Sequence, residues 1–261
     1  MKYFKLLLFI ALGLIGVSFL IIPILGILLG TPFADIKTAV LSREVVNSII
    51  LTLFSGLIST IIGIVIGIPI AYLIAFKDFR GKGLLESIID VPVMIPHTAA
   101  GIALLSVFGS RGLLGNMFSV FGIKFVGTIG GIIIGMMFVS ITYLINASKE
   151  GFKSIDRKYI KASMTLGANE FGTFFHIILP LSFKDIISGS IMSWARAISE
   201  FGAIVILAYH PMIAPVLIYE RFSTYGLKYS RPVVFLIIVI SLIIFIILRI
   251  ISNKMKNFRD K

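Results

Sequence analysis

The sequence predicts an all-α membrane protein with six transmembrane helices, and three observations support this fold class. Of the 261 residues, 58% are hydrophobic and only 14% are charged, whereas soluble domains carry about 25% charged residues. The mean hydropathy is +1.06. Six runs with few or no charges each have about the 20 residues that a helix needs to cross a bilayer. An ordinary soluble domain is therefore excluded.

The predicted spans follow in order at residues 6–30, 45–76, 88–109, 126–147, 186–209 and 232–251. Two lysines precede the first run, as in a secretory signal. Its 25 residues nevertheless exceed the core of about 7 to 15 of such signals, so we expect a retained helix. The second run has 32 residues, about 48 Å of helix against a core of about 30 Å, so it should tilt or project into water. Pro69 offers a kink there.

The distribution of Lys and Arg predicts the orientation. The alternate segments that include both chain ends hold 16 of these residues, and the intervening segments hold 7. The positive-inside rule therefore places both termini, the loop at 77–83 and the loop at 148–185 in the cytoplasm. An even number of spans agrees with this. Topology and anionic lipid headgroups account for most of the net charge of +12 without a nucleic-acid partner.

Small residues recur every fourth position within two of the runs. They are Ser55, Ser59, Gly63, Gly67, Ala71 and Ala75 in the second run, and Gly127, Gly131 and Gly135 in the fourth. Such stripes allow helix backbones to approach closely in lipid. Packing within one bundle is favoured over a dedicated dimer seam, because the pattern is common in membrane helices.

The loop at 154–180 is too long and too patterned for a simple connection. Apolar residues at helical spacing predict two short amphipathic helices, at about 155–166 and 171–178. Gly167 is placed to end the first helix, and Asn169 is placed to cap the second, which is expected to end before Pro180. Such a pair is either an interfacial element on the lipid headgroups or a docking knob for a cytoplasmic partner.

The segment KASMTLGANEFGTFFHIILP at 161–180 resembles the EAA loop of ABC-importer permeases. That loop has Glu-Ala-Ala, three residues, Gly, nine residues, Ile, one residue and Leu-Pro. Five residues match with every gap correct: Ala162, Gly167, Ile177, Leu179 and Pro180. Lys161 replaces the family Glu, which reverses a charge, and Ser163 replaces the second Ala. The resemblance implies that these seven positions couple the chain to an ATPase.

Two further segments extend the resemblance to molybdate, tungstate and sulfate permeases. They are DVPVMIPHTAAGIALL at 90–105, in which Pro92 and Pro96 would kink a helix near the path, and WARAISEFGA at 194–203. His97 stands where relatives often have a second proline. The resemblance implies a single permease domain over 1–261 with the ABC type I importer fold. It also implies a homodimer, two ABC ATPase subunits, an extracellular or periplasmic substrate-binding protein, and a prokaryotic cell membrane.

Two polar residues lie within the predicted fifth span. Arg196 and Glu200 are four residues apart and share a helix face. An Arg at the membrane centre costs about 2.5 to 3.5 kcal/mol, so we expect the two to pair. They either border an anion path or form a structural ion pair that fixes the helix.

No enzyme is predicted. The chain has no cysteine, its three histidines are not spaced as a helical metal pair, and no hydrolase motif is present. The absence of a P-loop motif means that ATP would be used by a partner subunit, so no cofactor and no metal are expected in this chain. The function implied by the resemblance is the permease subunit of an ATP-driven importer, with a path for an oxyanion, most of all molybdate or tungstate. The alternative is a secondary transporter or channel for a small anion without an ATPase partner.

Overall fold

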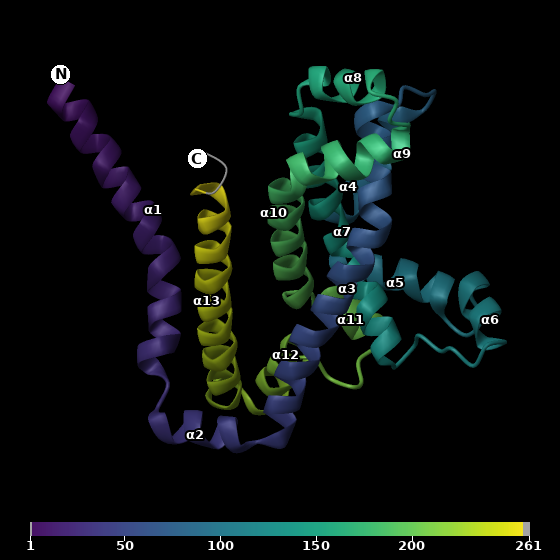
Figure 1. Ribbon diagram of the computed structural model, residues 1–261. Coiled ribbons are helices and arrows are strands. Elements are labelled where there is room, and N and C mark those ends of the chain that lie inside the picture. Colours follow the sequence, from purple (N-terminus) through teal and green to yellow (C-terminus); the bar gives the residue numbers. More distant parts are fainter. Residues whose placement is uncertain (1, 258–261) are drawn as a thin grey trace.

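The computed structural model describes residues 2–257, so Met1 and residues 258–261, including two C-terminal cations, lie outside the description. Within residues 2–257 every regular element is a helix (Figure 1). The elements are α1 Lys2–Gly30, α2 Phe33–Leu41, α3 Arg43–Phe76, α4 Lys82–Met94, α5 His97–Phe108, α6 Leu113–Ser119, α7 Ile129–Lys153, α8 Arg157–Thr165, α9 Glu170–Thr173, η1 Phe174–Ile178, α10 Leu179–Ile198, α11 Gly202–Leu207, α12 Ala214–Tyr225 and α13 Leu227–Asn257. The all-α fold class is confirmed.

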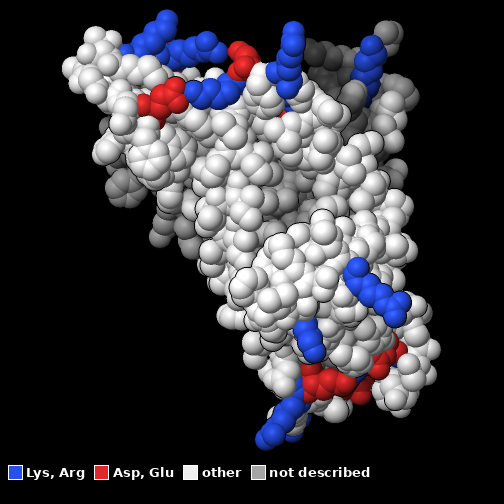
Figure 2. Space-filling view, turned by 90° about the vertical axis from the view of Figure 1, so that its right-hand side faces the viewer, with Lys and Arg blue, Asp and Glu red and all other residues white. Residues whose placement is uncertain are grey.

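Five of these helical stretches are long and apolar enough to cross a membrane, and the bent pair α4 and α5 adds a sixth if it counts as one span. On the face shown in Figure 2, the charged side chains gather toward the two ends of the molecule, and the broad band between them carries none. The start of α1, the end of α13 and helix α8 lie toward the same end, and α2 lies at the other (Figure 1).

The centre of the bundle is built from α3, α7 and α10. Gly67 of α3 faces α7 so closely that an added Cβ would lie 3.1 Å from Ile145 Cγ1. Ser59 Oγ donates to Ile133 O at 2.9 Å. The small residues of α3 thus bring its backbone against α7, which is the packing role predicted from the sequence. The prediction of a second stripe at Gly127, Gly131 and Gly135 is only partly correct. Gly127 precedes α7 and has φ +67°, so it does not share a helix face with the other two.

The third predicted span is wrong as a single helix over 88–109. α4 ends at Met94, α5 begins at His97, and the two axes are bent by 115°. Ile95 is extended, at φ −76° and ψ 147°, in line with the clash that disfavours the α region for a residue before a proline. Pro96 then caps α5, whereas Pro92 lies buried inside α4.

The fifth predicted span, 186–209, is displaced in the structure. A continuous helical stretch runs from Glu170 to Ile198, and α11 follows after a break at 199–201. The prediction that the helix ends before Pro180 is wrong. A π-helical turn, η1, precedes the proline, and Leu179 N–H bonds to Phe174 O, five residues back. This wider turn accommodates a residue that lacks an N–H group.

Candidate functional site

The predicted docking element consists of α8, Gly167 and α9, which together we call the knob. It lies at the same end of the molecule as the start of α1 (Figure 1). Asp156 caps α8 by accepting from Lys158 N–H at 2.9 Å. At the other end, Gly167 has φ +89°. Its N–H bonds to Met164 O, and the next N–H bonds to Ser163 O. These two bonds are the Schellman arrangement, which requires a left-handed residue.

Three contacts fix the second half of this knob. Asn169 Oδ1 accepts from Gly172 N–H at 2.7 Å, as predicted for a helix cap. Ser163 Oγ lies 3.0 Å from Thr173 Oγ1 and joins α8 to α9. Lys77, at the end of α3, donates to both oxygens of Glu170, at 2.7 and 2.8 Å. The hydrogen bond to Glu170 raises the pKa of Lys77 above its ordinary value of 10.5.

The knob leaves an apolar stripe exposed. Tyr159 and Ala162 of α8 and its C-cap residue Leu166 are spaced i, i+3 and i+7. All three are exposed, Leu166 at 89%. No residue of α8 is buried. Ile155 and Ile178, which lie within the two predicted helices of this loop, instead pack into the core of the bundle. The apolar surface that the knob leaves exposed is therefore the outer face of α8.

The seven predicted coupling positions do not all lie on this knob. Lys161, Ala162 and Gly167 are exposed on it, and Ser163 is half-buried at the junction with α9. The other three lie below the knob, where η1 joins α10: Ile177 and Leu179 are half-buried, and Pro180 is exposed.

Arg196 and Glu200 form the expected ion pair, with Arg196 Nη2 2.8 Å from Glu200 Oε2. The Glu200 side chain is 1% exposed and that of Arg196 is 18% exposed. Glu200 lies just after the end of α10, and its other oxygen accepts from Ala203 N–H at 2.8 Å. His97, from the start of α5, has its two ring nitrogens 3.0 and 2.9 Å from Arg196 Nη2. The pair is therefore a three-residue cluster at the two helix breaks.

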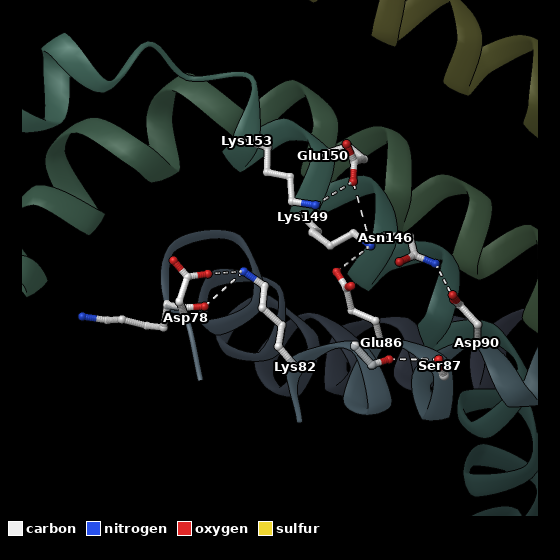
Figure 3. Close-up of polar contacts among 11 residues, drawn as sticks. Asp78, Lys82, Glu86, Ser87, Asp90, Asn146, Lys149, Glu150 and Lys153 are labelled. Carbon is white, nitrogen blue, oxygen red and sulfur yellow. Dashed lines mark hydrogen bonds and ion pairs between the residues drawn. The ribbon is translucent and has the colours of Figure 1, made fainter. Parts of the chain in front are cut away.

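A second polar cluster, between α4 and α7, was not identified from the sequence (Figure 3). Asn146 Nδ2 donates to Asp90 Oδ1 at 2.8 Å, and Lys149 Nζ lies 3.4 Å from Glu86 Oε1. Figure 3 shows the two acidic side chains of α4 pointing toward the Asn and Lys of α7. The spacing of Glu86 and Asp90, four residues apart, was the available signal, because it places both carboxylates on one helix face.

The described residues do not meet the requirements of a metal site. Within residues 2–257, no group of three or more His, Cys, Asp or Glu side chains is arranged to hold a metal ion. The two polar clusters combine Arg196 or Lys149 with carboxylates, and Asn146 with Asp90, so the contacts that they show are charge pairing and hydrogen bonding.

Comparison with known proteins identifies the family. Residues 63–257 match the inner membrane component of binding-protein-dependent transport systems. The molybdate/tungstate transport system permease protein WtpB of Pyrococcus abyssi is 38% identical over 97% of this chain and 98% of that protein. The WtpB protein of Pyrococcus furiosus is 39% identical over 95% and 96%. A probable sulfate transport system permease protein, cysT, of Zygnema circumcarinatum is 28% identical over 98% and 91%.

Solved structures share the fold. A bacterial ABC transporter involved in the import of the acidic polysaccharide alginate has a TM-score of 0.76 at 19% identity, covering 97% of this chain and 96% of that chain. An inward-facing MetNI methionine ABC transporter has a TM-score of 0.63 at 13% identity, covering 82% and 97%. The chain belongs to the family of inner membrane components of binding-protein-dependent transport systems, and it is a membrane permease subunit rather than an enzyme.

Proposed function

We propose that this chain forms the transmembrane path for molybdate or tungstate in an ATP-driven importer of a prokaryotic cell membrane. The WtpB relatives, which match nearly the whole chain, support this substrate class. ATP would bind and be hydrolysed in separate ABC ATPase subunits, and the chain itself would need no cofactor. An extracellular or periplasmic binding protein would deliver the anion to the outer mouth.

The observation that carries the coupling proposal is the exposed face of α8. Its apolar stripe at Tyr159, Ala162 and Leu166 has the i, i+3, i+7 spacing of a helix that inserts into a partner's groove. Contacts at both sides of Gly167 hold this helix in one orientation, so less conformational entropy is lost on binding. We assign this surface to the ATPase subunits. A secondary transporter would have no use for it.

The proposal also covers the topology of the chain and its assembly into a dimer. The chain would be one permease domain with six spans and both termini in the cytoplasm, where α4 and α5 together supply the third span. A homodimer would give the apolar surface of α1 a protein partner, because none of its predicted span is buried within one subunit. A reporter fused after Lys261 should be active only in its cytoplasmic form. Activity of an extracellular reporter at that position would contradict this topology.

The helix breaks would border the anion path. The break at Pro96 bends the third span and brings the start of α5 to Arg196 and Glu200, whereas Pro92 lies within α4. Irregular backbone at membrane depth occurs only where it is buried in protein or lines a cavity. This arrangement favours a role in the path over a purely structural ion pair.

The substrate assignment is tested by ATPase stimulation. The permease, its ATPase and its binding protein are reconstituted together, and the rate of ATP hydrolysis is measured with the binding protein loaded with tungstate, molybdate or sulfate. Tungstate and molybdate should stimulate hydrolysis more than sulfate does. Equal or greater stimulation by sulfate would contradict the proposed substrate.

A further inference from the structure

The breaks in the third and fifth spans meet at one place. A Cβ added to Gly202, the first residue of α11, would lie 2.6 Å from His97 Cβ and 3.1 Å from Thr98 N. The first turns of α5 and α11 are therefore in direct contact, and Figure 1 shows these helices side by side. The contact places the start of α5 beside the end of α10, which carries Arg196.

The accessible part of this junction is cationic. The carboxylate of Glu200 is 1% exposed, whereas Arg196 is 18% and His97 is 44% exposed. One Glu200 oxygen is occupied by Ala203 N–H, so only Oε2 faces Arg196 Nη2 and His97 Nδ1, at 2.8 and 3.2 Å. A ligand that approaches from the exposed side would meet the guanidinium and the imidazole before the carboxylate.

The first turn of α5 adds to this positive character. The first helical bond of α5 runs from Ala100 N–H to Pro96 O, and no side chain caps the helix. The three preceding N–H groups thus have no partner within the helix. A helix N-terminus carries the equivalent of about half a positive charge. Arg196 and this terminus together outweigh the single negative charge of Glu200, and the imidazole of His97 adds a polar group beside them.

We propose that Arg196, His97 and the first turn of α5 form an intramembrane subsite for a tetrahedral oxyanion with two negative charges. Glu200 is the internal counter-ion that holds Arg196 while the subsite is empty. The planar guanidinium can donate two parallel hydrogen bonds to such an oxyanion. Glu200 remains attached to α11 through Ala203 N–H when the anion replaces it at Arg196. This inference rests on the proposed function and adds the place where the substrate pauses within the membrane.

The subsite is tested by tungstate binding to the purified permease–ATPase complex in the absence of the binding protein. Equilibrium dialysis with elemental analysis measures the Kd of wild type, Glu200→Gln and Arg196→Gln. The Gln amide oxygen can still accept from Ala203 N–H but no longer competes as an anion. Glu200→Gln should therefore bind tungstate about tenfold more tightly, and Arg196→Gln at least about tenfold more weakly.

Two further variants separate binding from structural effects. Arg221→Gln changes another Arg–Glu pair, Arg221 with Glu44 at 2.6 Å, and should leave the Kd unchanged. His97→Phe should weaken binding several-fold while the melting temperature stays close to wild type. Equal tungstate affinity of wild type, Glu200→Gln and Arg196→Gln would overturn the subsite. Tungstate uptake by the wild-type transporter, measured in parallel, distinguishes failure of the subsite from failure of the proposed function. Uptake without the expected changes in Kd would refute only the subsite. Absence of uptake would refute the proposed function.

Discussion

Replacing Gly167 by Val should uncouple the permease from its ATPase without unfolding the bundle. The residue adopts φ +89°, and an added Cβ would meet no atom within 4 Å. The cost therefore arises from the backbone and not from a steric clash with neighbours. A left-handed conformation costs a non-glycine residue about 1 to 2 kcal/mol, and more for a β-branched one. Opening the turn instead would lose its two Schellman hydrogen bonds, worth about 1 kcal/mol each.

Either route destabilises the observed orientation of α8 by about 2 kcal/mol, which raises the Kd for the ATPase about 30-fold if only this orientation binds. The assay compares the Kd of wild-type and Gly167→Val permease for the purified ATPase, with melting temperature as a check on folding. Gly167→Asn should lose less, because Asn tolerates the left-handed region.

Gly122 provides a matched control. It has φ +74°, an added Cβ there would also meet nothing within 4 Å, and its turn has the same pair of hydrogen bonds. It follows α6, far from α8 (Figure 1). Gly122→Val should therefore keep the wild-type affinity for the ATPase. If Gly167→Val also keeps that affinity, or if both variants lose it equally, the assignment of the knob as the coupling surface is wrong.

Three further predictions concern the bundle and its charges. Arg196→Ala should lower the melting temperature more than Arg196→Ala with Glu200→Ala, because the single change strands a buried carboxylate at a cost of about 3 kcal/mol; simple additivity of the two single losses would show that they are not paired. Gly67→Leu should lower the free energy of unfolding by about 1 to 3 kcal/mol, because the larger side chain would push α3 away from Ile145 of α7. An unchanged melting temperature would contradict this close packing. The pKa of Lys77 is raised by its hydrogen bond to Glu170, so the stability gained from this pair is fully present below pH 10.5 and is lost as the pH rises through the higher folded-state pKa. Lys77→Met should remove that alkaline loss from the pH dependence of the melting temperature.

The helices of this fold could be predicted from the sequence because lipid imposes a simple requirement on each span. Long apolar runs had to be helical, and the positions of Gly167 and Asn169 gave the ends of the knob helices through their capping chemistry. The sequence predicted a kink at Pro96 but not a complete break between two helices. The run remains apolar on both sides of it, so composition does not separate a kinked helix from two helices at 115°.

The polar clusters required tertiary structure. Arg196 and Glu200 are only four residues apart in the sequence, so their pairing could be predicted from local spacing although α10 ends at Ile198. His97 is 99 residues from Arg196, and only the two helix breaks bring them together. The seam of Asp90 with Asn146 likewise joins residues 56 positions apart. Their helical periodicity gave each residue a face but did not identify the helix opposite.

ATP-dependent accumulation of tungstate is the decisive test of the proposed function. Proteoliposomes that contain the permease and its ATPase, with ATP inside and the tungstate-loaded binding protein outside, are followed by elemental analysis of the lumen. We expect tungstate to accumulate against its gradient and the accumulation to stop when ATP is replaced by ADP. Gly167→Val should reduce the accumulation far more than Gly122→Val does. Accumulation at the same rate with ADP, or without any ATPase subunit, would contradict the proposed function.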